Sequence, residues 1–337
     1  MVTIKDVAKA ANVSPSTVSR VISGNKRISE ATRLEVLTVM KELNYEPNHA
    51  ARTLVTKQSK IIGIIQKSGY NETRQNPFNI DVLSGIYNSC KANGYATIST
   101  TSEQYQDIEK EVNHMINYHT IDGFILLYSK ENDLIEKLLS ERKMPYVVIG
   151  KSLTNQKVIH IDNDNVEAAE HLTQYLISLG HTDLLFLAES RNYEVVKDRI
   201  QGYLNIVKQK SVKGRINYFD LNQSNIKSYF ENLKAYHELP SVIITSDTML
   251  NHIVLSVLYE LQLHVPTAIQ TATFNDSYLA EFAAPPQTAV NIHPKLLGEA
   301  AGDSIIQLIS GEPVTDFNKV IPTNIIKRIS TYNINKE

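Results

Sequence analysis

Short apolar runs rich in β-branched residues alternate with helical patterns through most of this 337-residue chain. Runs of this length suit buried strands, and amphipathic spacing such as that of residues 80–93 fills the intervals between them. The alternation is typical of parallel sheets with crossover helices, so we expect an α/β body of two lobes. The predicted strands are residues 61–65, 96–99, 123–128 and 146–149, and then 184–187, 216–219, 242–245 and 269–273.

The first 44 residues have the spacing of three short helices. The first has apolar residues at i, i+3, i+4 and i+7, namely Ile4, Val7, Ala8 and Ala11. Ser14 followed by Pro15 predicts the start of a second helix, because a hydroxyl caps free N–H groups and proline suits the first helical position. A third helix, capped by Ser29 and ending near Asn44, is expected to turn these side chains toward the same core: Leu34, Val36, Leu37, Met40 and Leu43.

The second helix has two chemically different sides. The apolar side consists of the Thr17 methyl group, Val18, Val21 and Ile22. The other side carries Ser16, Ser19, Arg20 and Ser23. Short hydroxyl side chains and one guanidinium can reach base edges in a DNA groove, so this side is a candidate recognition surface.

Charge separates the N-terminal segment from the body. Residues 1–60 hold ten Lys and Arg against five Asp and Glu, a net charge of +5, whereas the net charge of −2 for the chain leaves −7 for the remainder. A three-helix bundle that only packs or dimerises would not need this asymmetry. A basic head on an acidic body is typical of contact with a phosphate backbone.

Residues 3–22 (TIKDVAKAANVSPSTVSRVI) and 43–48 (LNYEPN) resemble the head of the lactose and galactose repressor family, LacI/GalR. The resemblance implies a helix-turn-helix head whose second helix lies in the major groove of double-stranded operator DNA. Pro15, Ser16 and Arg20 would then take base-reading positions, although Pro15 could equally serve only to start the helix. A guanidinium can bond bidentately to guanine, which favours Arg20. The other implied DNA contacts of the head are Thr3, Ser14, Thr17, Ser19 and Asn25.

Residues 48–54 (NHAARTL) match the next segment of the family. An isolated helix this short is marginal in water, so we expect it to fold when two copies meet on DNA. Asn48, Ala51 and Leu54 would contact the DNA, with Leu54 wedged into a minor-groove step. The alternative for Leu54 is an ordinary anchor on the body. A homodimer is expected, because one recognition helix covers only a few base pairs.

The resemblance extends through the body and implies two Rossmann-like lobes arranged as in periplasmic sugar-binding proteins. The expected divisions are a helix-turn-helix head at 1–46, a hinge helix and linker at 47–59, and a core at 60–337, with lobe 1 at about 60–160 and 293–322 and lobe 2 at about 161–292 and 323–333. The last helix, residues 294–309, would return to lobe 1. Ligands of such open sheets bind at the carboxyl ends of the strands, here between the lobes.

Polar and aromatic residues just after predicted strands are candidates for binding a small sugar effector. Arg199 lies in Asp198-Arg-Ile-Gln-Gly-Tyr203, which resembles the family's Arg-x-x-Gly-Tyr element, and one guanidinium can donate paired hydrogen bonds to adjacent hydroxyls. Asp247 and Asn275 could accept from the same hydroxyls. The full set is Phe78, Lys151, Asp162, Arg199, Asp247 and Asn275, with Pro77, Gly150, Ser246 and Asp276 beside them. Asp162 and Asp247 could instead cap helices, and Phe78 could belong to the core.

Residues 274–292 are similar to the corresponding stretch of maltose-operon regulators, which implies maltose or a related glucoside as the effector. Other sugars, and a sugar phosphate, remain open at this point. A phosphate usually attracts a cluster of Lys and Arg, and among the candidates away from Arg199 only Lys151 supplies a cation. Ser246, Thr273 and Asn275 depart from the family's usual residues at these sites.

The pattern gives no support to an enzyme. The sequence has no phosphate-binding G-x-x-x-x-G-K-[S/T] loop, no H-E-x-x-H and no G-x-S-x-G elbow, and its ten histidines are scattered. Cys90 is the single cysteine, which rules out an internal disulfide and suits the cytoplasm. We expect no cofactor, no metal and no membrane contact, since no signal peptide opens the chain and no apolar run is long enough to span a membrane.

Two alternative functions are a global catabolite regulator and a simple sugar-binding module. A branch of the family responds to a phosphorylated carrier protein that docks beside the helix at 294–309, which would make this chain a global catabolite regulator. That helix offers Lys295 beside Glu299 and Asp303, a poor phosphate receptor. A simple sugar-binding module would leave residues 1–56 without a purpose.

Overall fold

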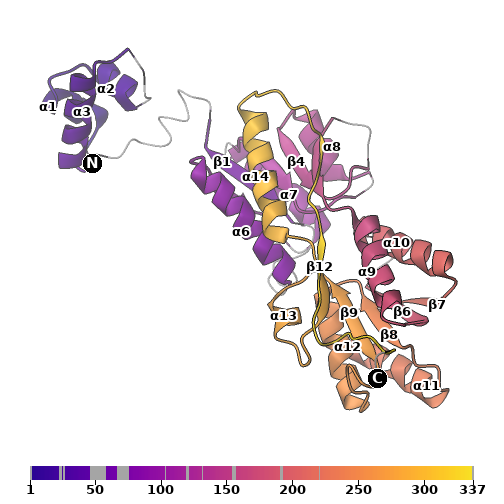
Figure 1. Cartoon of the computed structure of the whole chain (residues 1–337). Helices are drawn as coiled ribbons and strands as arrows, with labels where there is room; N and C mark the ends of the chain where they lie inside the picture. The colour runs from indigo at the N-terminus through magenta and orange to yellow at the C-terminus, as the bar shows by residue number, and fades with distance from the viewer. Residues whose placement is uncertain are drawn as a thin grey trace. The chain divides into compact units, whose positions relative to one another are not determined.

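The computed structural model describes residues 2–22, 25, 27–45, 58–66, 76–102, 104–118, 121–130, 132–153, 157–189, 193–219 and 221–335. The chain divides into two compact units, Met1–Ser59 and Lys60–Glu337, which we call the head and the core (Figure 1). The predicted hinge contacts Asn48, Ala51 and Leu54 lie outside the described residues.

The described part of the head contains three helices: α1 (Ile4–Ala10), α2 (Pro15–Ile22) and α3 (Glu30–Glu42). Both predicted hydroxyl caps are present, because the Thr17 N–H donates to Ser14 Oγ at 3.2 Å and the Thr32 N–H donates to Ser29 Oγ at 3.3 Å. The small core that joins the helices consists of Val7, Ala8, Ala11, Val18, Val21, Val36 and Val39.

The predicted inner face of α3 is partly wrong. Leu34 and Leu37 are 60% and 48% exposed, whereas Val36 and Val39 are buried. With 3.6 residues per turn, the stripe that contains Val36, Val39 and Leu43 faces the other two helices and turns Leu34 and Leu37 toward solvent. The valines Val36 and Val39, and not Leu34 and Leu37, therefore fill the core beside α3.

Lobe 1 of the core is an all-parallel sheet in the order β11-β5-β4-β3-β1-β2. α6 and α14 cover one face and α7 and α8 the other, as their buried side chains show. Its elements are β1 (Ile61–Ile65), α6 (Pro77–Ala92), β2 (Ala96–Ser99), α7 (Tyr105–Tyr118), β3 (Gly123–Leu126), α8 (Leu134–Glu141), β4 (Tyr146–Ile149), β5 (Ile159–Asp162), α14 (Pro294–Ile309) and β11 (Asn318–Val320).

Lobe 2 repeats this plan with the order β12-β10-β9-β8-β6-β7, and only the β10–β12 pair in this sheet is antiparallel. α9 and α10 cover one face, α11 and α12 the other. Its elements are α9 (Asn165–Ser178), β6 (Asp183–Ala188), α10 (Glu194–Lys210), β7 (Lys213–Tyr218), α11 (Gln223–Ala235), β8 (Val242–Thr245), α12 (Thr248–Glu260), β9 (Gln270–Phe274), α13 (Tyr278–Glu281), β10 (Thr288–Asn291) and β12 (Asn324–Ile326).

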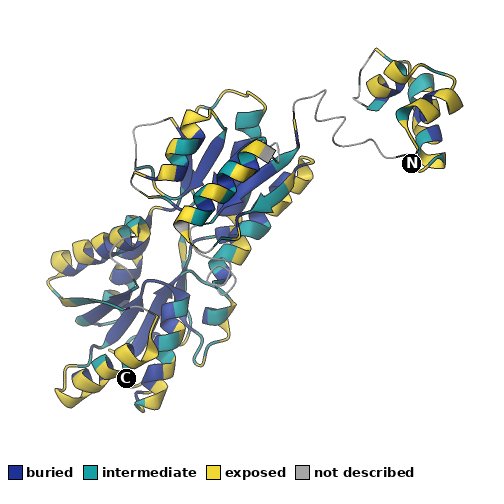
Figure 2. Ribbon diagram, turned by 180° about the vertical axis from the view of Figure 1, so that it is seen from behind, coloured by how far each residue is buried: buried dark blue, intermediate teal, exposed yellow. Residues whose placement is uncertain are grey.

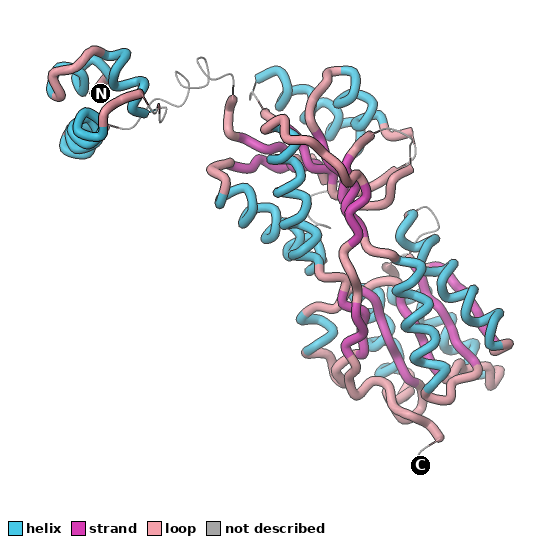
Figure 3. Tube along the Cα trace, turned by 45° about the horizontal axis from the view of Figure 1, so that its top comes forward, coloured by secondary structure: helices cyan, strands magenta, loops and turns pink. Residues whose placement is uncertain are grey.

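The central strands of both sheets are buried between helices whose outer sides are exposed, whereas the edge strands β2, β7, β11 and β12 are only partly covered (Figures 2 and 3). Within the described residues the chain passes between the lobes three times, after β5, after β10 and after β11. The carboxyl ends of β1, β3 and β4 in lobe 1 and of β6 and β8 in lobe 2 lead into residues of one pocket. No helix in the described part of the chain has the length and apolar character needed to cross a membrane.

Candidate functional site

The outer side of α2 in the head is polar and open. Ser16, Ser19 and Arg20 are exposed, as is Pro15 at the start of the helix, while Val18 and Val21 are buried beneath them. Burial of the apolar stripe thus fixes which side chains face outward. The described residues of the predicted recognition surface lie together on one helix face, which is the geometry that base reading requires.

The other predicted DNA contacts in the head hold its loops in shape. Ser14 Oγ lies 2.8 Å from Ser16 Oγ and 2.9 Å from Thr17 Oγ1 at the start of α2. Thr3 precedes α1 and donates to Asp6 Oδ2 from its backbone N–H at 2.8 Å and from its hydroxyl at 2.7 Å. Asn25 Oδ1 accepts from the Arg27 N–H at 2.9 Å. Each of these residues therefore has a structural task in addition to any contact with DNA.

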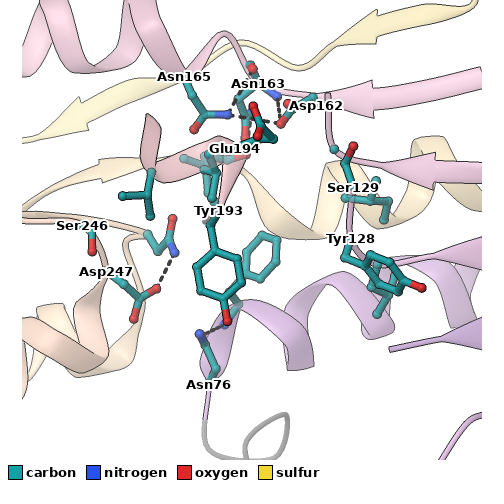
Figure 4. Close-up of a pocket in the computed structure, with 18 of the residues that line it drawn as sticks. Asn76, Tyr128, Ser129, Asp162, Asn163, Asn165, Tyr193, Glu194, Ser246 and Asp247 are labelled. Atoms are coloured by element: carbon teal, nitrogen blue, oxygen red, sulfur yellow. Dashed lines mark hydrogen bonds between the residues drawn. The ribbon is translucent and has the colours of Figure 1, made fainter. Parts of the chain in front are cut away.

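A cavity of about 580 Å³ lies between the two lobes of the core. Its size falls within the range of small-molecule sites, about 300 to 1,000 Å³. Residues from the carboxyl ends of strands in both lobes line it, together with the first residues of helices α6, α10 and α12 (Figure 4). All six predicted effector contacts are among them: Phe78, Lys151, Asp162, Arg199, Asp247 and Asn275.

Arg199 is the best-anchored charge of the pocket. It lies on α10, is 3% exposed and stacks over the Phe274 ring, with Cζ 4.5 Å from the ring centroid. Its Nε donates to Asn165 Oδ1 at 3.0 Å, Nη1 to the Ser246 carbonyl at 2.6 Å, and Nη2 to Asn275 Oδ1 at 3.0 Å. A guanidinium has five N–H groups, and these bonds to described residues use three of them.

Burial lowers the pKa of Arg199 to about 10. Nearby carboxylates oppose this shift, and the largest opposing effect is that of Asp247. The side chain is still charged at neutral pH. Asp247 is 8% exposed, and burial raises its pKa, while hydrogen bonds to its carboxylate oppose the rise. A buried carboxylate near a buried guanidinium keeps both groups ionised more readily than either alone.

Asp247 accepts hydrogen bonds from several residues, among them Asn76. Its Oδ1 accepts from the Met249 N–H at 2.7 Å, which caps α12, and its Oδ2 accepts from Asn275 Nδ2 at 2.5 Å. The predicted capping role of Asp247 is thereby confirmed. Asn275, held in the left-handed region at φ +64°, uses its amide to connect Arg199 with Asp247. The chain's own bonds thus fix the polar atoms that would meet sugar hydroxyls.

Asp162 ends β5 at the first passage between the lobes. Its Oδ1 accepts from the Asn163 N–H at 2.8 Å and from Asn165 Nδ2 at 3.2 Å, whereas Asp164, not Asp162, caps α9. Burial raises the pKa of Asp162 to about 6, opposed first by the bond from the Asn163 N–H and then by the charge of Arg199. The alternative role of Asp162 as a helix cap is therefore wrong.

Asn163 ties the three passages together. Its Nδ2 donates to the carbonyl of Ile292, which follows β10, at 3.1 Å, and to that of Ile321, which follows β11, at 2.8 Å. The side chain is 7% exposed and also lines the pocket. One amide thus connects the ligand cavity with all three chain segments that join the lobes.

Two predicted contacts reach across the cavity. Phe78, at the start of α6, packs against the apolar cores of both lobes, so its alternative role in core packing holds together with its place in the pocket lining. Lys151 follows β4 in lobe 1 and its Nζ lies 2.8 and 3.0 Å from the two carboxylate oxygens of Asp198 in lobe 2. Its ammonium is therefore committed to the chain itself.

Several lining residues were not predicted from the sequence, and two predicted neighbours of the site, Pro77 and Asp276, do not line the cavity. Asn76 and Tyr193 are N-cap residues of helices and point toward one another from opposite lobes (Figure 4). Asn163 follows β5, a strand that the sequence pattern did not predict. Asp276 does not line the cavity, because both of its oxygens bind Arg328, at 2.7 and 3.1 Å.

The charged residues of the lining are mostly acidic. Among the lining residues that the structure describes, the acidic ones are Asp162, Glu189, Glu194 and Asp247 and the cations are Lys151 and Arg199. Within the ranges that the structure describes, no three His, Cys, Asp or Glu side chains are grouped so as to hold a metal ion. The cavity offers hydrogen bonding and apolar contact rather than a cationic anion-binding site.

Comparison with known proteins agrees with this architecture. Residues 3–48 match the model for bacterial regulatory proteins of the lacI family, and residues 173–331 match the periplasmic binding protein-like domain. The chain is 61% identical over 334 residues to the HTH-type transcriptional regulator MalR of Staphylococcus xylosus, covering 99% of each chain.

Two solved structures give the same picture. One, from Staphylococcus aureus, is described as a probable maltose operon transcriptional repressor and matches with 41% identity and a TM-score of 0.77 over 81% of this chain and 98% of its own. The other is a complex of the transcriptional regulator CelR with cellobiose, with 25% identity and a TM-score of 0.74 over 98% of this chain and all of its own. The 61% identity to MalR of Staphylococcus xylosus over 99% of each chain shows the family. The chain belongs to the lacI family of bacterial regulatory proteins and is a transcriptional regulator.

Proposed function

We propose that this regulator is a repressor whose affinity for operator DNA is controlled by maltose or a related glucoside bound between the core lobes. The observation that carries the proposal is the pocket lined by Arg199 and Asp247, where Asn275 joins a fixed guanidinium to a fixed carboxylate. Adjacent hydroxyls of a sugar can accept from the first and donate to the second.

Charge supports an uncharged ligand. Four carboxylates line the cavity against two cations, and one of these, Lys151, is held by Asp198. A phosphorylated sugar would meet repulsion from these carboxylates, and of the two cations among the described lining residues Lys151 is already bound to Asp198. The cavity is also large enough for a disaccharide, and the MalR and CelR relatives support a glucoside of that size.

In the proposed complex two heads of a homodimer read the half-sites of a near-palindromic operator. Arg20 and Ser16 on the exposed side of α2 contact bases, and the basic charge of the head neutralises phosphates. Under this proposal residues 47–59 are the hinge helix and linker, and Leu54 enters a minor-groove step of the DNA. The protein carries out this role in the cytoplasm and has no enzymatic activity.

Sugar binding draws the lobes together and shifts lobe 1 of each protomer against its partner. The paired hinge helices then separate, and affinity for DNA falls. Such couplings amount to about 1 to 3 kcal/mol. The bonds from Asn163 to the other passages favour motion of each lobe as one body, because they join all three connecting segments.

The test is fluorescence anisotropy of the full chain on labelled DNA from upstream of neighbouring sugar-uptake genes, titrated with and without maltose at fixed salt. We expect tight binding that maltose weakens. Salt must be fixed because phosphate contacts make the affinity depend steeply on it. Tight binding that ignores maltose, cellobiose and other glucosides would leave a DNA reader and overturn the sugar control.

Two substitutions separate reading from sensing. Arg20→Ala should abolish specific DNA binding and keep sugar binding, since Arg20 is exposed on the head. Arg199→Ala should do the reverse. Lys41→Ala, which removes another exposed cation of the head at the end of α3, is the matched control for Arg20 and should lower DNA affinity only slightly. A shared defect of both variants in both assays would indicate misfolding.

Docking of a phosphorylated carrier protein on α14 has less support. Lys295 is exposed there, but Glu299 and Asp303 lie on the same helix, and Asp303 accepts a hydrogen bond from Ser89 at 2.5 Å. An acidic surface of this kind repels a phosphoserine. Stoichiometric capture of the phosphorylated carrier by the full chain would reverse this ranking.

A further inference from the structure

One ion pair joins the two lobes across the ligand cavity. Lys151, which lines the cavity from lobe 1, donates from Nζ to Asp198 Oδ1 at 2.8 Å and to Oδ2 at 3.0 Å. Asp198 lies on α10 in lobe 2, next to Arg199. The neighbouring pairs Lys213–Asp183 and Lys227–Glu260, by contrast, each lie within lobe 2.

The backbone holds both partners in place. The Ser129 hydroxyl donates to the Lys151 carbonyl at 2.5 Å, and the N–H of the preceding Gly150 donates to the Ile161 carbonyl at 2.8 Å. Gly150 has φ +135°, and a Cβ atom there would meet Ser129 Cβ at 2.9 Å, so the residue before Lys151 must stay glycine. Asp198 is fixed by the second turn of a 17-residue helix.

The surroundings strengthen the pair. The Asp198 side chain is 17% exposed and that of Lys151 is 47% exposed, which places the contact between a surface pair and a buried one. Asp162 and Glu194 add negative charge around the ammonium, while Lys197 binds Glu194 at 2.5 Å.

We infer that Lys151 and Asp198 form a latch that favours the conformation with the lobes together, and so set how tightly the pocket holds its sugar. A contact between the lobes stabilises only conformations in which the lobes are close. A ligand gains affinity when its binding conformation is already populated. The two residues are therefore positioning residues that act through the lobe arrangement, and this part of the inference rests on the proposed sugar function.

The latch is tested first without sugar, by pulsed electron paramagnetic resonance on the full chain. Spin labels are placed at Lys137→Cys on α8 in lobe 1 and Lys208→Cys on α10 in lobe 2, both of which are exposed. Cys90 is fully buried and burial raises its pKa to about 11, so its thiol stays unlabelled. Lys151→Met should lengthen and broaden the distance distribution, and Lys151→Arg should leave it near that of the parent.

Sugar affinity is measured next, by calorimetry with maltose. Lys151→Met and Asp198→Asn should each weaken binding by about threefold to tenfold, as expected for a partly exposed ion pair. The double variant should be no weaker than either single one, because each removes the same contact. Added salt should weaken binding to the parent and have little effect on the double variant. Lys227→Met, which breaks a pair within lobe 2, is the matched control and should leave affinity unchanged.

The outcomes separate the latch from the proposed function. If Lys151→Met changes the distance between the spin labels but calorimetry finds no sugar binding to the parent chain, the latch is supported and sugar control is rejected. Unchanged distances would reject the latch, whatever the sugar affinity. Effects of Lys151→Met and Asp198→Asn that add in the double variant would also reject it, since Lys151 would then contact the sugar directly.

Discussion

Arg199 and Asp247 show how a single buried charge depends on its partner. Arg199 is 3% exposed and Asp247 8%, and Asn275 connects them. Removing one member of such a pair leaves an uncompensated charge, which costs about 3 to 5 kcal/mol. Arg199→Met should therefore lower the free energy of unfolding by that amount, measured by urea denaturation of the full chain. Arg199→Met combined with Asp247→Asn should recover part of the loss.

A more exposed pair provides the control. Arg215 and Asp183 lie 2.9 Å apart with side chains 22% and 25% exposed. Solvent screens this pair, so Arg215→Met should cost only about 1 kcal/mol. Equal losses for Arg199→Met and Arg215→Met, or no recovery in the double variant, would mean that burial does not govern the Arg199 interaction.

Asp162 gives stability a specific dependence on pH. Burial raises its pKa from 3.8 to about 6, so between these values the folded state binds a proton that the unfolded state does not. The resulting destabilisation is present above pH 6 and is relieved as pH falls through 6 toward 3.8. Asp162→Asn carries no such charge. We expect it to be more stable than the parent at pH 8, and the difference in unfolding free energy to shrink at pH 5.

Asp164→Asn is the matched control for that comparison, since Asp164 caps α9 one turn away and keeps its capping oxygen as an amide. Its stability difference from the parent should change little between pH 8 and pH 5. An Asp162→Asn difference that is the same at both pH values would contradict the role of the carboxyl proton.

Helices α6 and α14 meet with backbone against backbone. A Cβ atom on Gly298 would lie 2.0 Å from the Val82 carbonyl oxygen, and one on Gly302 would lie 2.6 and 2.7 Å from Ser89 Cβ and Oγ. Alanine gains about 1 kcal/mol of helix propensity over glycine. Overpacking against backbone outweighs this gain, so Gly298→Ala should lower the free energy of unfolding by about 3 kcal/mol.

Gly302→Ala is the internal comparison on the same helix. Its clash is with the Ser89 side chain, whose atoms can shift, so the loss should be distinctly smaller than for Gly298→Ala. Thermal unfolding of both variants gives the order. A Gly302→Ala variant less stable than Gly298→Ala would contradict the argument from backbone contact.

The elements that sequence predicted well are those with a local signal. The starts of α2 and α3 follow from their capping hydroxyls, and α14 has the predicted bounds. β5 was missed because His160 and Asp162 interrupt its apolar pattern, and β11 and β12 are three residues long, defined by pairing with distant strands. The prediction for α3 was wrong because it placed the hydrophobic side chains of Leu34 and Leu37 in the core, whereas the helix turns both toward solvent.

In the pocket, too, residues with a local sequence signal were predicted and residues brought together by the folding of the whole core were not. The rule that ligands bind near the ends of parallel strands, together with the family's Arg-x-x-Gly-Tyr element for Arg199, predicted six lining residues. It could not find Tyr193 or Asn76, which enter the cavity from helix starts, nor the pairing of Lys151 with Asp198, residues that meet only when the lobes fold against each other.

Control of DNA binding by a sugar must act in both directions. If maltose weakens operator binding by a given factor, operator DNA must weaken maltose binding by the same factor, because the coupling free energy is shared. A coupling of about 1 to 3 kcal/mol corresponds to a change of about 5- to 150-fold in each affinity. Calorimetric titration of maltose into the full chain, free and saturated with operator, should reveal that factor at one salt concentration.

DNA of the same length with a scrambled sequence is the control, and it should change maltose affinity far less than the operator does. Under the proposed function the Arg20→Ala variant does not bind the operator. Its affinity for maltose should therefore be the same with operator DNA, with scrambled DNA and without DNA. Equal maltose affinity for the parent with and without operator would leave the reader and the pocket intact but uncoupled. The bonds of Asn163 would then hold the lobes together without transmitting their movement to the head.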